Sequence, residues 1–169
     1  MTISGKTFWQ TVVAGLIATF VMTVTGFWQS GLGLPAMDVG AMLAGNMTSA
    51  HPDAPYTLFA GNLMHVATGV LLALIWVVFL QPRIPGNWFV QGIVYAVLTA
   101  LAAAVSVVPL AAGAGIFFSN TPAPLWMLLG DTTAHLAYAL TLTLSLKVAG
   151  VEPVPRQIPA SERVAEPVG

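Results

Sequence analysis

Asp131 and His135 are the residues of this chain best suited to acid–base or ligand chemistry, and they lie one helical turn apart. Both fall in the apolar stretch Trp126 to Leu146, which is about long enough to cross a bilayer. An aspartate at the centre of a spanning helix costs about 2.5 to 3.5 kcal/mol, so a chain that keeps one usually pairs it or uses it. His65 lies in an earlier apolar stretch. We expect the two imidazoles and the carboxylate to share one layer inside a membrane protein.

Three interpretations of this polar layer are open. In a structural layer, Asp131 bonds His135 along its own helix, and His65 bonds Thr19 or Thr23 across a helix interface, at about 0.6 kcal/mol per bond. In a cofactor site, His65 and His135 ligate a haem b, or both hold a divalent metal together with Asp131. Asp131 would equally serve to orient a ligating His135. In a proton or solute path, Asp131 is the relay group of a small proton-coupled transporter.

The sequence lacks the short motifs of the common hydrolases, so an intramembrane hydrolase is not expected. It contains no Gly-x-Ser-x-Gly elbow, no His-Glu-x-x-His and no Walker loop. Cysteine is absent, which excludes disulfides, thiol redox chemistry and thiolate metal sites. The net charge is −1 with no basic block, so nucleic acid is not an expected partner.

The composition is that of an integral membrane protein. Hydrophobic residues make up 57% of the 169 residues and charged residues only 7%, against about 25% charged in a soluble domain. Four apolar segments are each close to the ~20 residues that a spanning helix needs. They are Phe8 to Trp28, Leu58 to Leu80, Trp88 to Leu110 and Leu125 to Leu146.

The basic residues predict the orientation of these segments. All five fall on one side of a four-span topology: Lys6, Arg83, Lys147, Arg156 and Arg163. Both termini are therefore expected in the cytoplasm. The first apolar run is longer than the roughly 7 to 15 residues of a signal peptide, so we expect it to be retained. At 1.5 Å per residue, His65 would lie roughly 10 to 13 Å and His135 roughly 15 Å below the outer boundary.

Small and polar residues recur every four positions in each segment, which places them on one helix face. The ridges are Gly15, Thr19 and Thr23; Gly61, His65, Gly69 and Ala73; Gly92, Ala96, Ala100 and Ala104; and Asp131, His135, Ala139 and Thr143. Small residues let membrane helices approach closely, so we expect these faces to point into the bundle. Aligning His65 with His135 also suggests a parallel repeat of two helical hairpins.

The connections and the tail complete the expected organisation. Within the first outside connection, Leu34 to Gly45 reads as a short helix opened by Pro35, lying in the interface or capping the bundle. We expect one bundle domain over residues 1–150. The tail, residues 151–169, holds four prolines and mixed charge and is expected to be a disordered cytoplasmic extension.

Three short motifs carry a family resemblance. They are Ala-Thr-x-x-Met-Thr at Ala18 to Thr23, Gly-Leu-Pro-Ala-Met-Asp at Gly33 to Asp38, and a histidine early in the second and fourth segments. The chain thereby resembles an uncharacterised family of small four-helix bacterial inner-membrane proteins. The resemblance covers most of Gly15 to Leu146 and implies architecture and the bacterial inner membrane, with no catalytic residue.

The sequence thus predicts an all-α, polytopic membrane protein with four transmembrane helices. Its expected partners are the lipid bilayer and other membrane proteins or further copies of itself. The leading functional hypothesis is a non-enzymatic accessory or assembly subunit. The alternatives are a haem- or metal-binding bundle using His65 and His135, and a proton-coupled transporter using Asp131.

Overall fold

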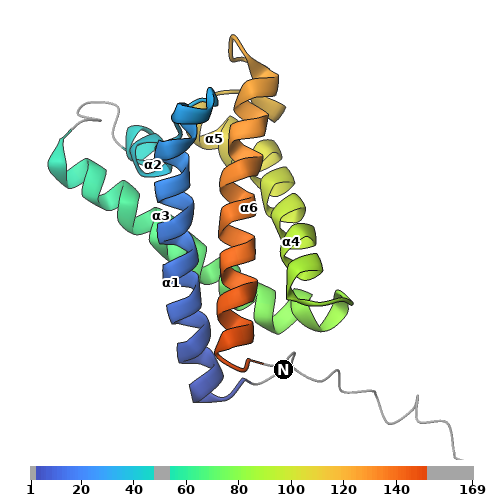
Figure 1. Ribbon diagram of the computed structural model, residues 1–169. Coiled ribbons are helices and arrows are strands. Elements are labelled where there is room, and N and C mark those ends of the chain that lie inside the picture. Colours follow the sequence, from blue (N-terminus) through green and yellow to red (C-terminus); the bar gives the residue numbers. More distant parts are fainter. Residues whose placement is uncertain (1–2, 48–53, 152–169) are drawn as a thin grey trace, which may run out of the picture.

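The computed structural model describes residues 3–47 and 54–151, and all regular elements in these ranges are helical (Figure 1). In chain order they are α1 (Gly5–Trp28), the 3-10 turn η1 (Gln29–Leu32), α2 (Val39–Met47), α3 (Pro55–Ile75), the π-helical turn η2 (Trp76–Leu80), the 3-10 turn η3 (Gln81–Arg83), α4 (Trp88–Ala102), the π-helical turn η4 (Ala103–Val107), α5 (Val108–Ala112), the 3-10 turn η5 (Ile116–Phe118) and α6 (Pro124–Val148). The predicted all-α class is confirmed for the described residues.

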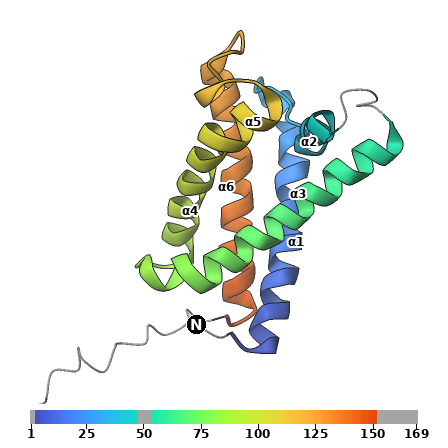
Figure 2. The ribbon, with the colours of Figure 1, turned by 180° about the vertical axis from the view of Figure 1, so that it is seen from behind.

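The last helix, α6, is the centre of the arrangement. It packs along α1 on one side and along α4 on the other, while α3 crosses this layer obliquely (Figures 1 and 2). The short helix α2 packs on α3. The start of α1 and the end of α6 lie at the same end of the molecule, where the Gln10 side-chain amide donates to the Ala149 carbonyl at 2.8 Å.

Local sequence explains where the long helices begin. Ser4 caps α1 by accepting a hydrogen bond from the Thr7 amide at 3.1 Å. The Asn87 side chain caps α4 by accepting from the Phe89 and Val90 amides. Helices α3 and α6 each begin with a proline, whose missing N–H would have no partner in the first turn.

The predicted ridges of small and polar residues face the interior. Of their fifteen members, fourteen are buried and Thr23 is half-buried. Glycines on these ridges set the closest helix approaches. A Cβ at Gly15 would lie 2.9 Å from Ala73 Cβ, and one at Gly92 would lie 2.8 Å from Thr143 Oγ1. Side chains larger than hydrogen would therefore separate α1 from α3 and α4 from α6.

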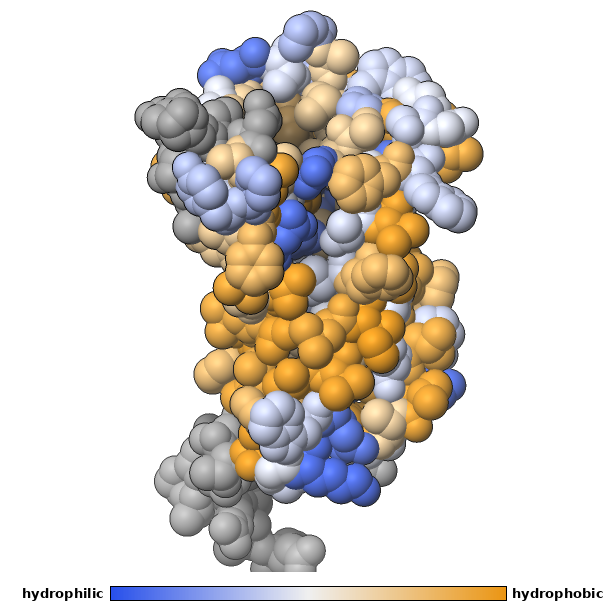
Figure 3. Space-filling view, turned by 90° about the vertical axis from the view of Figure 1, so that its left-hand side faces the viewer, coloured by the Kyte–Doolittle hydropathy of each residue, from blue (hydrophilic) through white to orange (hydrophobic). Residues whose placement is uncertain are grey.

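Three helical spans are long and apolar enough to cross a membrane: Gly5–Leu32, Pro55–Arg83 and Trp88–Leu110. They are compatible with an integral membrane protein. The fourth predicted segment lies within α6, which is not among these three because Asp131, His135 and several threonines lower its hydropathy. Figure 3 shows the matching surface, an apolar belt with hydrophilic residues gathered toward the two ends and in a hollow of the upper half.

Several boundaries differ from the sequence-based prediction. The helix of the first connection begins at Val39 rather than at Pro35, because the Asp38 carboxylate accepts a hydrogen bond from the Ala41 amide at 2.8 Å and starts the helix there. Helix α1 also starts earlier than Phe8, at Gly5. The expected disordered tail lies outside the described residues, apart from Val151.

Candidate functional site

Asp131 and His135 form a pair along the buried face of α6. His135 Nδ1 lies 2.9 Å from the Asp131 backbone oxygen and 3.4 Å from Asp131 Oδ1. A carbonyl oxygen only accepts, so Nδ1 carries the proton and donates to it. This arrangement leaves His135 Nε2 as the ring atom that faces other groups. Both side chains are buried, at 5% and 8% exposure.

One oxygen of this pair has no partner. Asp131 Oδ2 is buried and accepts no hydrogen bond within the described part of the chain. Leaving a buried polar atom without a partner costs about 1 to 3 kcal/mol, and more when the group is charged. Asp131 Oδ2 can therefore still take up a proton or accept a hydrogen bond from a water molecule or another donor.

His65 joins the pair from α3. Its side chain is 7% exposed and interacts electrostatically with both His135 and Asp38. Asp38 is an exposed residue directly before α2. The buried polar residues here are thus two imidazoles and one carboxylate, with the exposed Asp38 carboxylate as a further charge that acts on His65. That His65, His135 and Asp131 share one layer as a site stays a prediction.

Asp38 is the charged residue near His65 that the sequence did not predict. It lies in a connection instead of a spanning segment, so neither helical periodicity nor membrane depth selects it. The available signal is local: an acidic residue that directly precedes a helical run and can cap it. His51 and Asp53 of the same connection lie outside the described residues.

The two threonines proposed for the layer bond within their own helix. Thr19 Oγ1 donates to the Gly15 carbonyl at 2.8 Å, and Thr23 Oγ1 donates to the Thr19 carbonyl at 2.9 Å. Among the described residues, neither threonine forms the expected hydrogen bond with His65. Thr19 instead packs against Gly69, one turn inward from His65, since a Cβ on Gly69 would lie 1.9 Å from Thr19 Oγ1.

An aromatic cluster of Trp76, Tyr95 and Tyr138 packs next to the polar layer, on the side that faces the chain termini. Tyr138 donates to the Gly69 carbonyl at 2.6 Å, and Tyr95 donates to the Leu72 carbonyl at 2.7 Å. The Trp76 and Tyr95 ring centroids are 4.4 Å apart. Trp76 is fully buried, and its indole N–H has no acceptor among the described residues. Trp76 lies about one turn before the end of the apolar segment Leu58 to Leu80, and nothing in the sequence predicted that it is buried in the core.

These contacts bear on the predicted haem or metal. Among the described residues, no three His, Asp or Glu side chains form a group that could hold a metal ion. The hydrogen bond from Tyr138 to Gly69 brings α3 and α6 into contact one turn from both histidines. The tyrosine side chain spans the space between these two helices, and a haem held by His65 and His135 stays a prediction. In this conformation the described residues offer no site for a metal with three protein ligands.

A second buried polar group lies close to the layer on α6. Gln29, 1% exposed, donates through Nε2 to the Pro35 carbonyl, while its Oε1 has no partner in the described ranges. A Cβ on Gly130 would lie 2.9 Å from Gln29 Nε2, so this glycine lets the connection after α1 pack directly on α6.

No family model, curated protein or solved structure matches the chain.

Proposed function

We propose that this chain is a four-helix integral membrane protein of the bacterial inner membrane that acts as a non-enzymatic accessory or assembly subunit. The observation that carries the proposal is how little of each candidate span the bundle covers. Only 28 to 33% of each apolar window is buried. The remaining surface is available to lipid and to the helices of other membrane proteins.

The outer half of α3 is the best candidate contact surface for a partner. Tyr56, Phe59 and Leu63 are spaced by three and four residues, so they share one face of the helix, and they are 64%, 70% and 58% exposed. Asn62 lies at the edge of this face and is also exposed. Asparagine side chains in membrane-spanning helices form hydrogen bonds across helix interfaces, whereas lipid tails have no hydrogen-bonding groups. Asn62 Nδ2 already donates to the Leu58 carbonyl at 2.9 Å, so a partner helix would mainly cover the apolar and aromatic face.

Helix α6 completes the proposed four spans. Its 25 residues correspond to roughly 37 Å, enough for a hydrocarbon core of about 30 Å. Its polar residues Asp131 and His135 are buried between neighbours, so they need not face lipid. The described cations Lys6, Arg83 and Lys147 follow the positive-inside pattern for cytoplasmic termini. The parallel repeat of two hairpins stays a prediction.

A crosslinking experiment tests the accessory role. The chain has no cysteine, so a single cysteine is a unique attachment point for a photoreactive probe. Phe59→Cys places the probe on the α3 face, and Val97→Cys, at a 48% exposed residue of α4, is the matched control. We expect a crosslink to a second polypeptide in native membranes from position 59 and a much weaker one from position 97. Free monomer on a native gel, with no crosslink at position 59, would contradict the proposal.

A proton-coupled transporter using Asp131 is a second candidate, favoured by the unpartnered Asp131 oxygen. The contacts on the inner side of the layer count against it. The Tyr138 and Thr143 hydroxyls that follow along α6 both donate to backbone carbonyls, and Leu142 and Leu146 are 0% exposed, so this stretch offers no carboxylate or imidazole to continue a relay. Proton flux into vesicles is the direct test. An Asp131→Asn flux equal to that of the original chain would end this candidate.

The haem- or metal-binding alternative is tested separately. The test measures the absorption spectrum and the metal content of the protein purified in mild detergent. A Soret band or stoichiometric metal that disappears in His65→Ala or His135→Ala would overturn the accessory role. We expect neither signal.

A further inference from the structure

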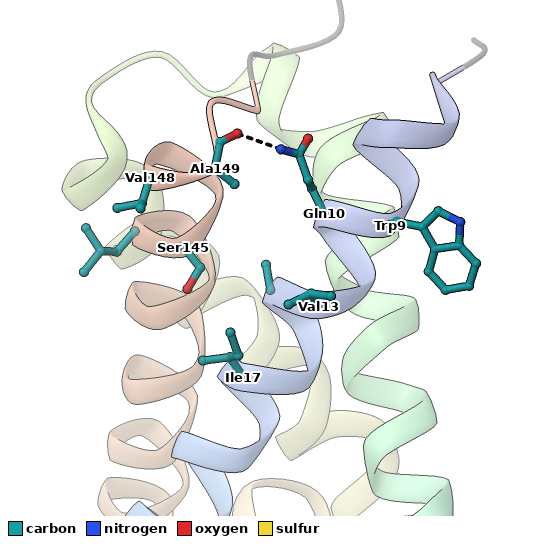
Figure 4. A pocket seen from close by; sticks show the side chains of 9 residues that line it. Trp9, Gln10, Val13, Ile17, Ser145, Val148 and Ala149 are labelled. Atoms are coloured by element: carbon teal, nitrogen blue, oxygen red, sulfur yellow. Dashed lines mark hydrogen bonds between the residues drawn. The ribbon is translucent and has the colours of Figure 1, made fainter.

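A groove of about 590 Å³ runs between α1 and α6 at the end of the molecule where the chain termini lie (Figure 4). One wall is formed by α1 residues that include Gln10, Val13 and Ile17, and the other by α6 residues that include Ser145 and Val148. The groove is separate from the polar layer, which lies toward the opposite end of α6. Neither the layer nor the α3 face uses these residues.

The walls of the groove are almost entirely apolar, and its polar atoms gather at one end. The Gln10 amide donates across the groove to the Ala149 carbonyl at 2.8 Å (Figure 4). Below this bridge, Val13 and Ile17 remain 52% and 46% exposed. A ligand that fits must therefore be apolar along its length, with its polar part near the Gln10 end.

The charges at this end favour an anionic ligand. Lys6 precedes Gln10 by four residues on α1, so its exposed side chain projects over the same helix face. The first turn of α1 contains no acidic residue. The described acids, Asp38 and Asp131, belong to the opposite half of the molecule, so nothing in the described chain neutralises Lys6. Lys147 is engaged elsewhere, since its Nζ lies 5.8 Å from the centroid of the Trp88 ring.

We propose that this groove binds one acyl chain of an anionic phospholipid, with the headgroup phosphate beside Lys6. The bound lipid would fill the space between α1 and α6 that the protein leaves open. This inference rests on the proposed membrane insertion, because it places the Lys6 end of α1 at a lipid headgroup layer.

Native mass spectrometry of the full chain tests the proposal. The protein is purified in detergent and exchanged against phosphatidylglycerol or phosphatidylcholine. We expect one phosphatidylglycerol to be retained per chain in preference to phosphatidylcholine. Lys6→Gln should reduce that preference about fivefold, the effect of one lysine near an anionic surface. Lys147→Gln, which removes the same charge from the same end, should leave the preference unchanged.

Two substitutions fill the groove from opposite walls. Ser145 points into the space between the helices (Figure 4), so Ser145→Phe should abolish lipid retention. Val13→Trp should do the same from α1. Val97→Phe on α4 adds comparable bulk to a surface outside the groove and should retain the lipid. Folding of every variant is checked by its thermal unfolding.

Specific outcomes would overturn the proposal. Equal retention of the two lipids by the original chain would do so, as would retention unaffected in a folded Ser145→Phe or Val13→Trp variant. A dimer lost in these variants would show that a second copy occupies the groove instead. Alkaline carbonate extraction separates this test from the broader proposal. A chain released by carbonate fails the membrane assignment, whereas a chain that stays in membranes without retaining lipid fails only the groove assignment.

Discussion

Replacing Gly69 with alanine should separate α1 from α3 at their crossing. The added Cβ would lie 1.9 Å from Thr19 Oγ1 and 3.0 Å from Thr19 Cβ. Thr19 cannot turn away freely, because its hydroxyl donates to the Gly15 carbonyl at 2.8 Å. Either this hydrogen bond breaks or the two helices move apart. Both outcomes raise the free energy of the folded bundle.

The expected cost is set by two opposing effects. An extra methyl group in a packed interior costs about 1 to 3 kcal/mol. Alanine gains about 1 kcal/mol over glycine in helix propensity. Gly69→Ala alone should therefore change the free energy of unfolding by between about 0 and 2 kcal/mol. Thr19→Ala removes Oγ1 and leaves only the Cβ at 3.0 Å, which a shift of a few tenths of an ångström relieves.

A double-mutant cycle isolates the steric effect, because the propensity gain appears in both Gly69 variants and cancels. We expect Thr19→Ala and Gly69→Ala to couple by about 1 to 2 kcal/mol, with the double variant more stable than the sum of the single changes predicts. Unfolding in mixed micelles with increasing denaturing detergent measures each free energy. Gly5→Ala, where a Cβ has no neighbour within 4 Å, is the control. Additivity within about 0.5 kcal/mol would refute the close approach of Thr19 and Gly69.

Three further predictions concern other contacts. Gly61→Val should displace α2 from α3, because a Cβ there would lie 2.1 Å from the Gly40 carbonyl oxygen. A reporter Ala44→Cys, at a residue with 0% exposure, should then be labelled by a maleimide much faster than in the Gly61 background; an unchanged rate would argue against this packing. Tyr138→Phe removes a 2.6 Å hydrogen bond to α3 and should cost about 0.6 kcal/mol in the same unfolding assay, so a loss above about 2 kcal/mol would reveal a larger role. Asn87→Ala removes the cap of α4 and should cost about 1 kcal/mol by that assay, while no loss would mean that the cap is dispensable.

Helical periodicity was sufficient to predict which residues face the interior. Because residues four apart share a helix face, the spacing of His65, Asp131 and His135 among glycines and alanines indicated burial, and all three are buried. Local capping chemistry was less well predicted. Pro35 looked like a helix start, whereas Asp38 three residues later is the residue that caps α2.

The relative placement of the helices could not be read from periodicity. The spacing of residues along a helix does not determine its tilt, so the oblique course of α3 was not predicted. The same limitation applies to the contacts that depend on tilt. Asp38 interacts electrostatically with His65 from a connection, and Trp76 lies in the core beside Tyr95. Both interactions join residues from different elements, for which the sequence offers no spacing rule.

The central position of α6 has a consequence for biosynthesis. The ribosome completes this helix after α1, α3 and α4, yet α6 is the element along which α1 and α4 pack. Until α6 emerges, α4 lacks its main neighbour. The packing of the described helices can therefore be completed only after α6 has been synthesised. A nascent chain truncated before Pro124 would leave uncovered the faces of α1 and α4 that pack on α6.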